Sequence, residues 1–215
     1  MKSFLAYPVK DPINQSNLFG ADPTYYQKVL GTNGHPGIDF ESPLYTPIYA
    51  PCDADAFYAQ DQYHGDGLYL RIPNNAAPTA EVILWHMPDK SDTSHWLLPT
   101  GQGVVSQVKA GQLIGYTGNS GYPQESNGPH LHFALRFLFG ANIVNEDNGF
   151  HGCVDPTPYF TGIHAQDVPT IQSIVDKSQQ VVSVVAQSAL PPNEKQNALQ
   201  KVETFLQGLL QELIP

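Results

Sequence analysis

Glycine and proline are concentrated in the first three quarters of this 215-residue chain, and their distribution restricts what the chain can fold into. Residues 1–160 hold 16 of the 18 glycines and 15 of the 19 prolines, whereas residues 161–215 hold a single aromatic side chain, Phe205. Both residue types interrupt helices and favour turns. We therefore expect short strands joined by turns in the first part and helices in the last part.

Segments rich in β-branched and aromatic residues alternate with turn-forming clusters in the first part. The expected strands are residues 47–50, 54–59, 68–72, 81–86, 113–116 and 130–135. The expected turns are residues 64–67, 73–75 and 118–121. Closely spaced strands with intervening turns predict a mainly β fold with an antiparallel sheet as its core.

Apolar residues recur at helical spacing in the last part, first from Ile171 to Val185 and again from Leu199 to Leu213. The pair Pro191-Pro192 separates the two stripes and is expected to end one helix and begin the next. This pattern predicts a domain over residues 1–162 and a C-terminal α-helical hairpin over residues 163–215. We expect the hairpin to dock on the core or to form a homo-oligomer with another copy. Membrane activity is less favoured, because the polar faces carry Gln and Ser instead of Lys.

Charge and composition exclude several functions. The net charge is -10 and no basic run occurs, which argues against nucleic-acid binding and against attraction to an anionic surface. No apolar stretch is long enough to span a membrane, and the apolar run near Met1 is too short for a signal peptide. We therefore expect synthesis in the cytoplasm without an obvious export route. Cys52 and Cys153 show neither metal-type spacing nor a disulfide framework and are expected to be buried thiols.

Histidines in three places carry the chemistry. In the segment His130-Leu131-His132-Phe133, alternation along a strand puts both imidazoles on one face while Leu131 and Phe133 enter the core. Two adjacent imidazoles form either a metal or acid–base site or a hydrogen-bonded pair without function. The residues alone leave both interpretations open.

A second group is His35 and Asp39, which can bind one cation if the turn at 36–37 brings them together, although a surface turn is the simpler reading. The third is His86, at the end of an apolar strand, which could equally lie at the edge of the core. Four imidazoles and one carboxylate suit zinc better than magnesium or calcium. Because the chain has no H-E-x-x-H motif, a histidine would have to transfer protons in a zinc hydrolase.

A series of segments in a defined order extends these observations to nearly all of residues 5–160. They are residues 7–9, 18–20, 35–39, 46–50, 84–87, 108–115, 119–121, 128–133 and 154–159. In this series the chain resembles the lysostaphin-like, LytM-type zinc endopeptidases of peptidase family M23, which cut peptidoglycan cross-bridges. The resemblance implies an antiparallel β-sheet core with a groove.

The resemblance also implies roles for individual residues. His35, Asp39 and His132 would ligate Zn²⁺, His130 would be the general base, and His86 would stabilise the oxyanion. The implied activity is zinc-dependent hydrolysis of peptide bonds in peptidoglycan cross-bridges or stem peptides. Two alternatives remain, namely a non-catalytic wall-binding or activator module on the same fold, and a phage virion assembly protein that uses the helical hairpin.

Some regions depart from the family pattern. Residues 88–104 and 136–153 are expected to form longer loops than usual, and Trp96 either stacks on substrate or anchors its own loop. His64, His95, His151 and His164 are expected to have no special role. The sequence does not specify which peptide bond is cut.

Overall fold

The computed structural model describes residues 3–73, 79–121, 128–168 and 171–213. The chain divides into two compact units, Met1–Val168 and Pro169–Pro215. The division expected at residue 162 would fall inside a strand, β12 (Phe160–His164), which pairs in parallel with β1 (Leu5–Tyr7) near the start of the chain. The first unit therefore extends to Val168.

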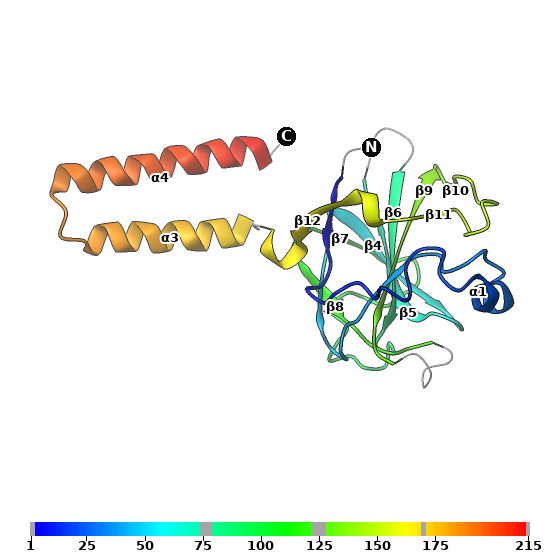
Figure 1. Cartoon of the computed structure of the whole chain (residues 1–215). Helices are drawn as coiled ribbons and strands as arrows, with labels where there is room; N and C mark the ends of the chain where they lie inside the picture. The colour runs from blue at the N-terminus through cyan, green and yellow to red at the C-terminus, as the bar shows by residue number, and fades with distance from the viewer. Residues whose placement is uncertain (1–2, 74–78, 122–127, 169–170, 214–215) are drawn as a thin grey trace. The chain divides into compact units, whose positions relative to one another are not determined.

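An antiparallel sheet forms the centre of the first unit (Figure 1). Its strands follow the order β10-β9-β6-β5-β4-β7, and β2 and β11 also pair with β9. The bounds of these strands are β2 Ile38–Phe40, β4 Ala54–Asp61, β5 Gly65–Arg71, β6 Thr79–Met87, β7 Val105–Val108, β9 Leu131–Phe139, β10 Asn142–Ile143 and β11 Cys153–Val154. A separate ribbon pairs β3 (Pro47–Tyr49) with β8 (Leu113–Tyr116). The expected mainly β, antiparallel fold is confirmed.

Two local expectations were wrong. The turn expected at 64–67 is shorter, because the Asp61 carboxylate accepts the backbone N–H groups of Tyr63 and His64 and closes the hairpin early, so that β5 begins at Gly65. The loop expected at 136–153 is partly strand, because β9 continues to Phe139 beside β6. The expected turn residues Asn74 and Asn75 lie outside the described residues.

The main core lies against one face of the sheet. Alternate residues of β6 and β9 enter it, among them Val82, Leu84, Leu131, Phe133 and Leu135, and all five are fully buried. The intervening residues point to the opposite face, where Ile83, Trp85, Ala134 and Cys153 form a second, smaller cluster. Both faces are thus covered, and His132 belongs to the second face by the same alternation.

Glu81 is a fully buried acidic side chain, and it binds two arginines on that second face. Arg71 and Arg136 both bind its carboxylate, and their guanidinium groups lie over the rings of Phe57 and Tyr69. A buried carboxylate with this many hydrogen bonds has a structural role, so Glu81 is not a spare catalytic acid.

The second unit is the expected helical hairpin, taken by itself. It consists of α3 (Ile171–Gln187) and α4 (Pro192–Leu213), which pack against each other. Among the described residues, no helix is both long and apolar enough to cross a membrane.

We expect Phe133→Ala to destabilise the first unit by about 3–5 kcal/mol, the range for removing a large buried aromatic side chain. Phe133 is fully buried, with its ring 5.2 Å from that of Phe160 and 6.3 Å from that of Phe40. Urea unfolding of the metal-free protein measures the change.

Phe139→Ala is the matched control, because this residue lies on the same strand but is 65% exposed. It should change the free energy of unfolding by no more than about 0.5 kcal/mol. Equal losses in the two variants would contradict the assignment of Phe133 to the core.

Candidate active site

Strand register brings the first two site residues together. In the β2–β9 pair Asp39 lies directly opposite His132, and in the β6–β9 pair Trp85 lies opposite His132 on the other side. Side chains of directly opposed residues are neighbours on one face of a sheet. Because Ile38 and Phe133 fill the core, Asp39 and His132 must point to the other face.

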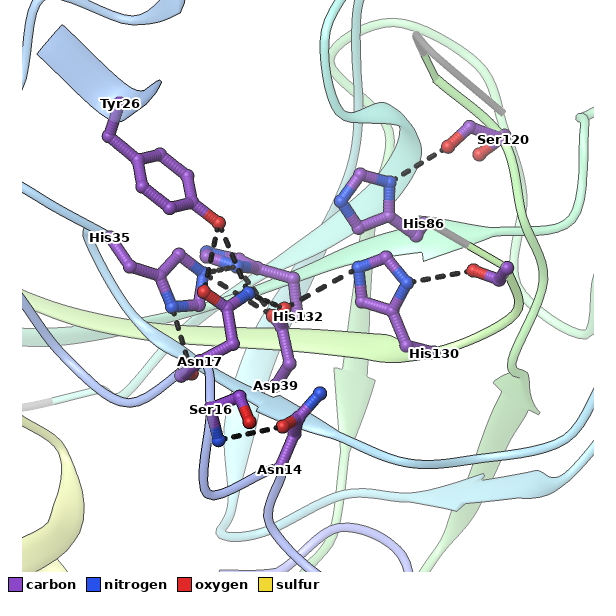
Figure 2. Close-up of polar contacts among 11 residues, drawn as sticks. Asn14, Ser16, Asn17, Tyr26, His35, Asp39, His86, Ser120, His130 and His132 are labelled. Carbon is purple, nitrogen blue, oxygen red and sulfur yellow. Dashed lines mark hydrogen bonds and ion pairs between the residues drawn. The ribbon is translucent and has the colours of Figure 1, made fainter. Parts of the chain in front are cut away.

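The third residue, His35, completes a compact cluster with Asp39 and His132 (Figure 2). His35 Nε2 lies 2.8 Å from His132 Nδ1, and the Asp39 carboxylate oxygen Oδ1 lies 3.3 Å from the first atom and 3.1 Å from the second. All three side chains are buried, and their ligand atoms lie within 4.8 Å of one another. They are close enough to share one cation.

Asn17 orients two of these three residues. Its backbone carbonyl accepts a hydrogen bond from His35 Nδ1 at 3.0 Å, so the proton of that ring is on Nδ1 and the lone pair of Nε2 faces the cluster. Its side-chain amide donates to Asp39 Oδ2, which leaves Oδ1 for the histidines. Asn17 was not predicted from the sequence, because an Asn 18 residues before His35 carries no recognisable spacing.

Tyr26 supports the same residues from a short helix, α1 (Pro23–Val29), that was not predicted. Its ring stacks on that of His35 with centroids 4.9 Å apart, and its hydroxyl hydrogen-bonds the Asn17 side chain. Burial and the nearby Asp39 carboxylate raise the pKa of Tyr26, so the hydroxyl stays protonated. The Asp22-Pro23 pair, an N-cap followed by proline, was the signal that could have revealed α1.

Gly37 is required for close packing. A Cβ at this position would lie 2.5 Å from the backbone oxygen of Phe133 and 2.7 Å from His132 Cε1. A glycine between His35 and Asp39 therefore lets this segment approach the ring of His132, a role beyond the turn that the sequence suggested.

His130 lies just before β9 and faces the cluster. Its Nδ1 donates to the backbone carbonyl of Gly128 at 2.9 Å, and its Nε2 lies 3.7 Å from Asp39 Oδ2. Figure 2 shows its ring between Asp39 and His86. The rings of His130 and His86 have centroids 4.4 Å apart.

His86 reaches the same site through a break in strand alternation. Strict alternation after Leu84 and Trp85 would turn His86 into the core, but its φ of 61° is left-handed and rotates the side chain out. Met87 takes the core position and is fully buried. His86 Nδ1 then donates to the backbone carbonyl of Ser120 at 2.8 Å. A left-handed non-glycine residue of this kind costs energy and often marks a functional site.

Burial and neighbouring groups shift the pKa values of three residues in the site. Burial lowers the pKa of His132 to about 4, and burial together with His130 and His132 lowers the pKa of His86 to about 3. Burial alone would raise the pKa of Asp39, but its contacts with the His132 and His35 imidazoles reverse that effect and hold it well below its usual value. Near neutral pH the fold therefore keeps His86 and His132 neutral and Asp39 charged.

A groove of about 880 Å³ is lined by all five expected site residues and also by Tyr63 and His64. His64, for which the sequence predicted no special role, therefore lies at the groove, where the short turn between β4 and β5 places it. Trp96 is only 9% exposed, and its Nε1 donates to the carbonyl of Pro88 at 2.9 Å. It anchors its own loop.

Two imidazole nitrogens and one carboxylate oxygen are the donor types that catalytic zinc sites use, usually with three protein ligands. The groups that orient these donors, a backbone carbonyl and an amide, are also typical around such metals. This site is buried and lies at a groove in a β sheet. Its composition and geometry best fit a metal-dependent hydrolase.

Comparison with known proteins supports that class. Residues 33–146 match the model of peptidase family M23, which is more than half of the chain, and the protein therefore belongs to this family. It is 34% identical over 106 residues to "Glycyl-glycine endopeptidase ALE-1" of Staphylococcus capitis, an alignment that covers 48% of this chain and 25% of the relative. It is 30% identical over 139 residues to "Peptidoglycan DD-endopeptidase ShyA" of Vibrio cholerae, covering 62% and 27%.

The fold has a similar counterpart among solved structures. Lysostaphin from Staphylococcus simulans aligns with a TM-score of 0.53 and 20% identity, over 80% of this chain and 62% of that one. This likeness concerns the fold alone. The chain spans about a quarter of the length of the two curated relatives.

We expect His35→Ala and His132→Ala to weaken Zn²⁺ binding by at least about 100-fold, whereas Asn17→Ala should weaken it by about 10–100-fold, as for residues that orient metal ligands. His130→Ala should keep nearly full affinity, because His130 lies beside the cluster and is not one of its three members. Competition with a chromogenic chelator measures these affinities. A loss of zinc in His130→Ala equal to that in His132→Ala would contradict the assignment.

The metal-free protein should lose stability as the pH falls from about 7 to about 4. His86 and His132 have folded-state pKa values of about 3 and about 4, below the ordinary 6.5, so the unfolded chain binds more protons throughout this interval. Lowering the pH through this interval therefore favours unfolding.

Urea unfolding at a series of pH values tests this, and His86→Gln is the comparison. This variant lacks one of the two titrating imidazoles, so its stability should depend less steeply on pH than that of the unaltered protein. An identical dependence would show that His86 is not held neutral by the fold.

Proposed function

We propose that this protein is a zinc-dependent endopeptidase that hydrolyses peptide bonds in bacterial peptidoglycan. The observation that carries the proposal is the convergence of His35, Asp39 and His132 at one point of a groove, with His130 and His86 directly beside it. The curated relatives support the substrate class, because one is named for glycyl-glycine bonds and another for peptidoglycan. Action at the cell wall is part of this proposal.

The three ligand residues would hold Zn²⁺ in a fixed position. His35 would bind through Nε2, Asp39 through Oδ1 and His132 through Nδ1, because these are the atoms that face one another. Bound zinc supplies Lewis-acid chemistry, which polarises a peptide carbonyl and makes water a stronger nucleophile near neutral pH.

His130 is the proposed general base. Its Nδ1 donates to the carbonyl of Gly128, so Nε2 carries the lone pair on the side of Asp39 and can take a proton from the attacking water. The backbone hydrogen bond keeps the ring oriented while the proton moves. The same nitrogen can later return the proton to the leaving amine.

His86 has a more restricted part than the sequence implied. Its Nδ1–H donates a hydrogen bond to the backbone carbonyl of Ser120, and its low pKa leaves Nε2 without a proton. In the resting state Nε2 can therefore only accept a hydrogen bond. We propose that it donates to the oxyanion only after a proton has reached Nε2. Its low affinity for protons makes it a weaker base than an ordinary imidazole, which favours His130 as the group that deprotonates water.

The alternative of a non-catalytic module on the same fold is less well supported. A binding module needs no buried metal ligands and no pair of oriented imidazoles, whereas this groove is lined by all five residues.

We expect the zinc-loaded protein to release new amino termini from purified bacterial walls, and His130→Ala to reduce the rate on the order of 100-fold while zinc remains bound. Walls with glycine cross-bridges and walls with direct cross-links should be digested in parallel, and mass spectrometry of the products identifies the bond.

A chelator should abolish the release and added Zn²⁺ should restore it. Full activity of His130→Ala would show that His130 is not the general base. The absence of cleavage in every wall type would overturn the proposed function.

A further inference from the structure

His64 lies in the groove wall but has no part in the proposed chemistry. Its ring stacks on that of Trp85, with centroids 5.3 Å apart and an angle of 18° between the planes. Its centroid lies 5.9 Å from that of His132 and 6.0 Å from that of His86. A further imidazole thus borders the groove close to the proposed catalytic and metal-binding residues.

Asp61 holds His64 in a fixed position. One carboxylate oxygen accepts the backbone N–H groups of Tyr63 at 2.8 Å and His64 at 2.6 Å, and the other lies 2.7 Å from His64 Nδ1. Three hydrogen bonds to one carboxylate, together with the stack on Trp85, determine both the backbone and the ring orientation. The side chain is therefore in place before any ligand binds.

The same hydrogen bonds determine which ring atom is left for a ligand. A carboxylate oxygen accepts and cannot donate, so Nδ1 carries a proton, and in the neutral imidazole Nε2 then carries a lone pair. Within the described part of the chain, Nε2 of His64 has no hydrogen-bond partner. The only groups that a bare Nε2 can bind are donors.

The backbone of His64 is also hydrogen-bonded to that of His86. Its carbonyl accepts the N–H of His86 at 3.2 Å, so the two residues keep a constant separation across the start of β5 and the end of β6. A peptide in the groove beside His86 must therefore pass close to His64.

We propose that His64 is a substrate-contacting residue, whose Nε2 accepts a hydrogen bond from a main-chain N–H of the peptide in the groove. The inference rests on the proposed function and extends it by one specific contact. An extended peptide presents N–H donors along its whole length, so this contact positions the chain and does not depend on particular side chains.

His64→Asn and His64→Gln separate the two ring nitrogens. The Asn amide can still donate to Asp61 but does not reach the position of Nε2, whereas the Gln amide oxygen reaches that position. Loss of one neutral hydrogen bond corresponds to about a 5–10-fold effect. We therefore expect His64→Asn to raise KM by this factor with kcat changed less than about twofold, and His64→Gln to recover part of the loss.

The chain contains a matched control. His95 has the same local construction, since its Nδ1 lies 2.7 Å from the carboxylate of Asp92, three residues before it, and its ring stacks on Tyr45 at 3.7 Å. His95 is not among the residues that line the groove. His95→Asn should therefore leave KM within about twofold of the unaltered protein, a change equivalent to well under one hydrogen bond.

The experiment uses the full chain loaded with zinc and, as substrate, soluble peptidoglycan fragments released from walls by a muramidase. The rate at which new amino termini appear is measured over a range of fragment concentrations for the unaltered protein and the three variants. Thermal unfolding midpoints within about 2 °C of one another show that differences in KM do not come from unfolding.

A second readout is independent of turnover. Addition of the same fragments to the His130→Ala variant should shift the nitrogen resonance of His64 Nε2, measured by NMR, and leave the resonances of His95 unchanged. Equal KM values for His64→Asn and His95→Asn, or no shift at His64 when fragments bind, would overturn the inference. An unaltered protein that releases no termini would overturn the proposed function first, and the inference with it.

Discussion

The register between β2 and β9 is the constraint on which the site depends. It sets Asp39 opposite His132 while the flanking residues Ile38 and Phe133 fill the core. Because side chains alternate along a strand, a slip by one residue would turn both polar residues into the main core and both apolar ones toward the groove. The burial of Phe133 is thus also what aims the ligand atoms, so stability and site geometry have the same physical origin.

The remaining site residues are placed by exceptions to regular structure. His35 depends on Gly37, whose missing Cβ leaves room for the ring of His132. His86 depends on a left-handed backbone, which costs on the order of 1–3 kcal/mol and is maintained by the burial of Met87 and the bond to Ser120. The regular sheet therefore supplies two ligands, and local irregularities supply the residues around them.

The sequence was sufficient for whatever depends on local pattern. The longer strands were predicted from their apolar and β-branched residues, and the five residues that the family resemblance implied do lie together at one groove. It was insufficient for Asn17 and Tyr26, because neither residue has a distinctive neighbourhood and each reaches His35 only through long-range packing. The end of the first unit was misplaced for the same reason, since β12 is defined by its pairing with β1 and not by its composition.

His64 and His95 show how far local chemistry determines a role. Each follows an aspartate by three residues, bonds to that carboxylate through Nδ1 and stacks on an aromatic ring. The aromatic partners differ in position. Trp85, the partner of His64, lies opposite His132 in the sheet, whereas Tyr45, the partner of His95, is exposed. Trp85 therefore brings His64 to the groove. The same pair of residue types lies at the groove in one place and forms a loop contact in the other, so its position follows from the strand against which the imidazole packs.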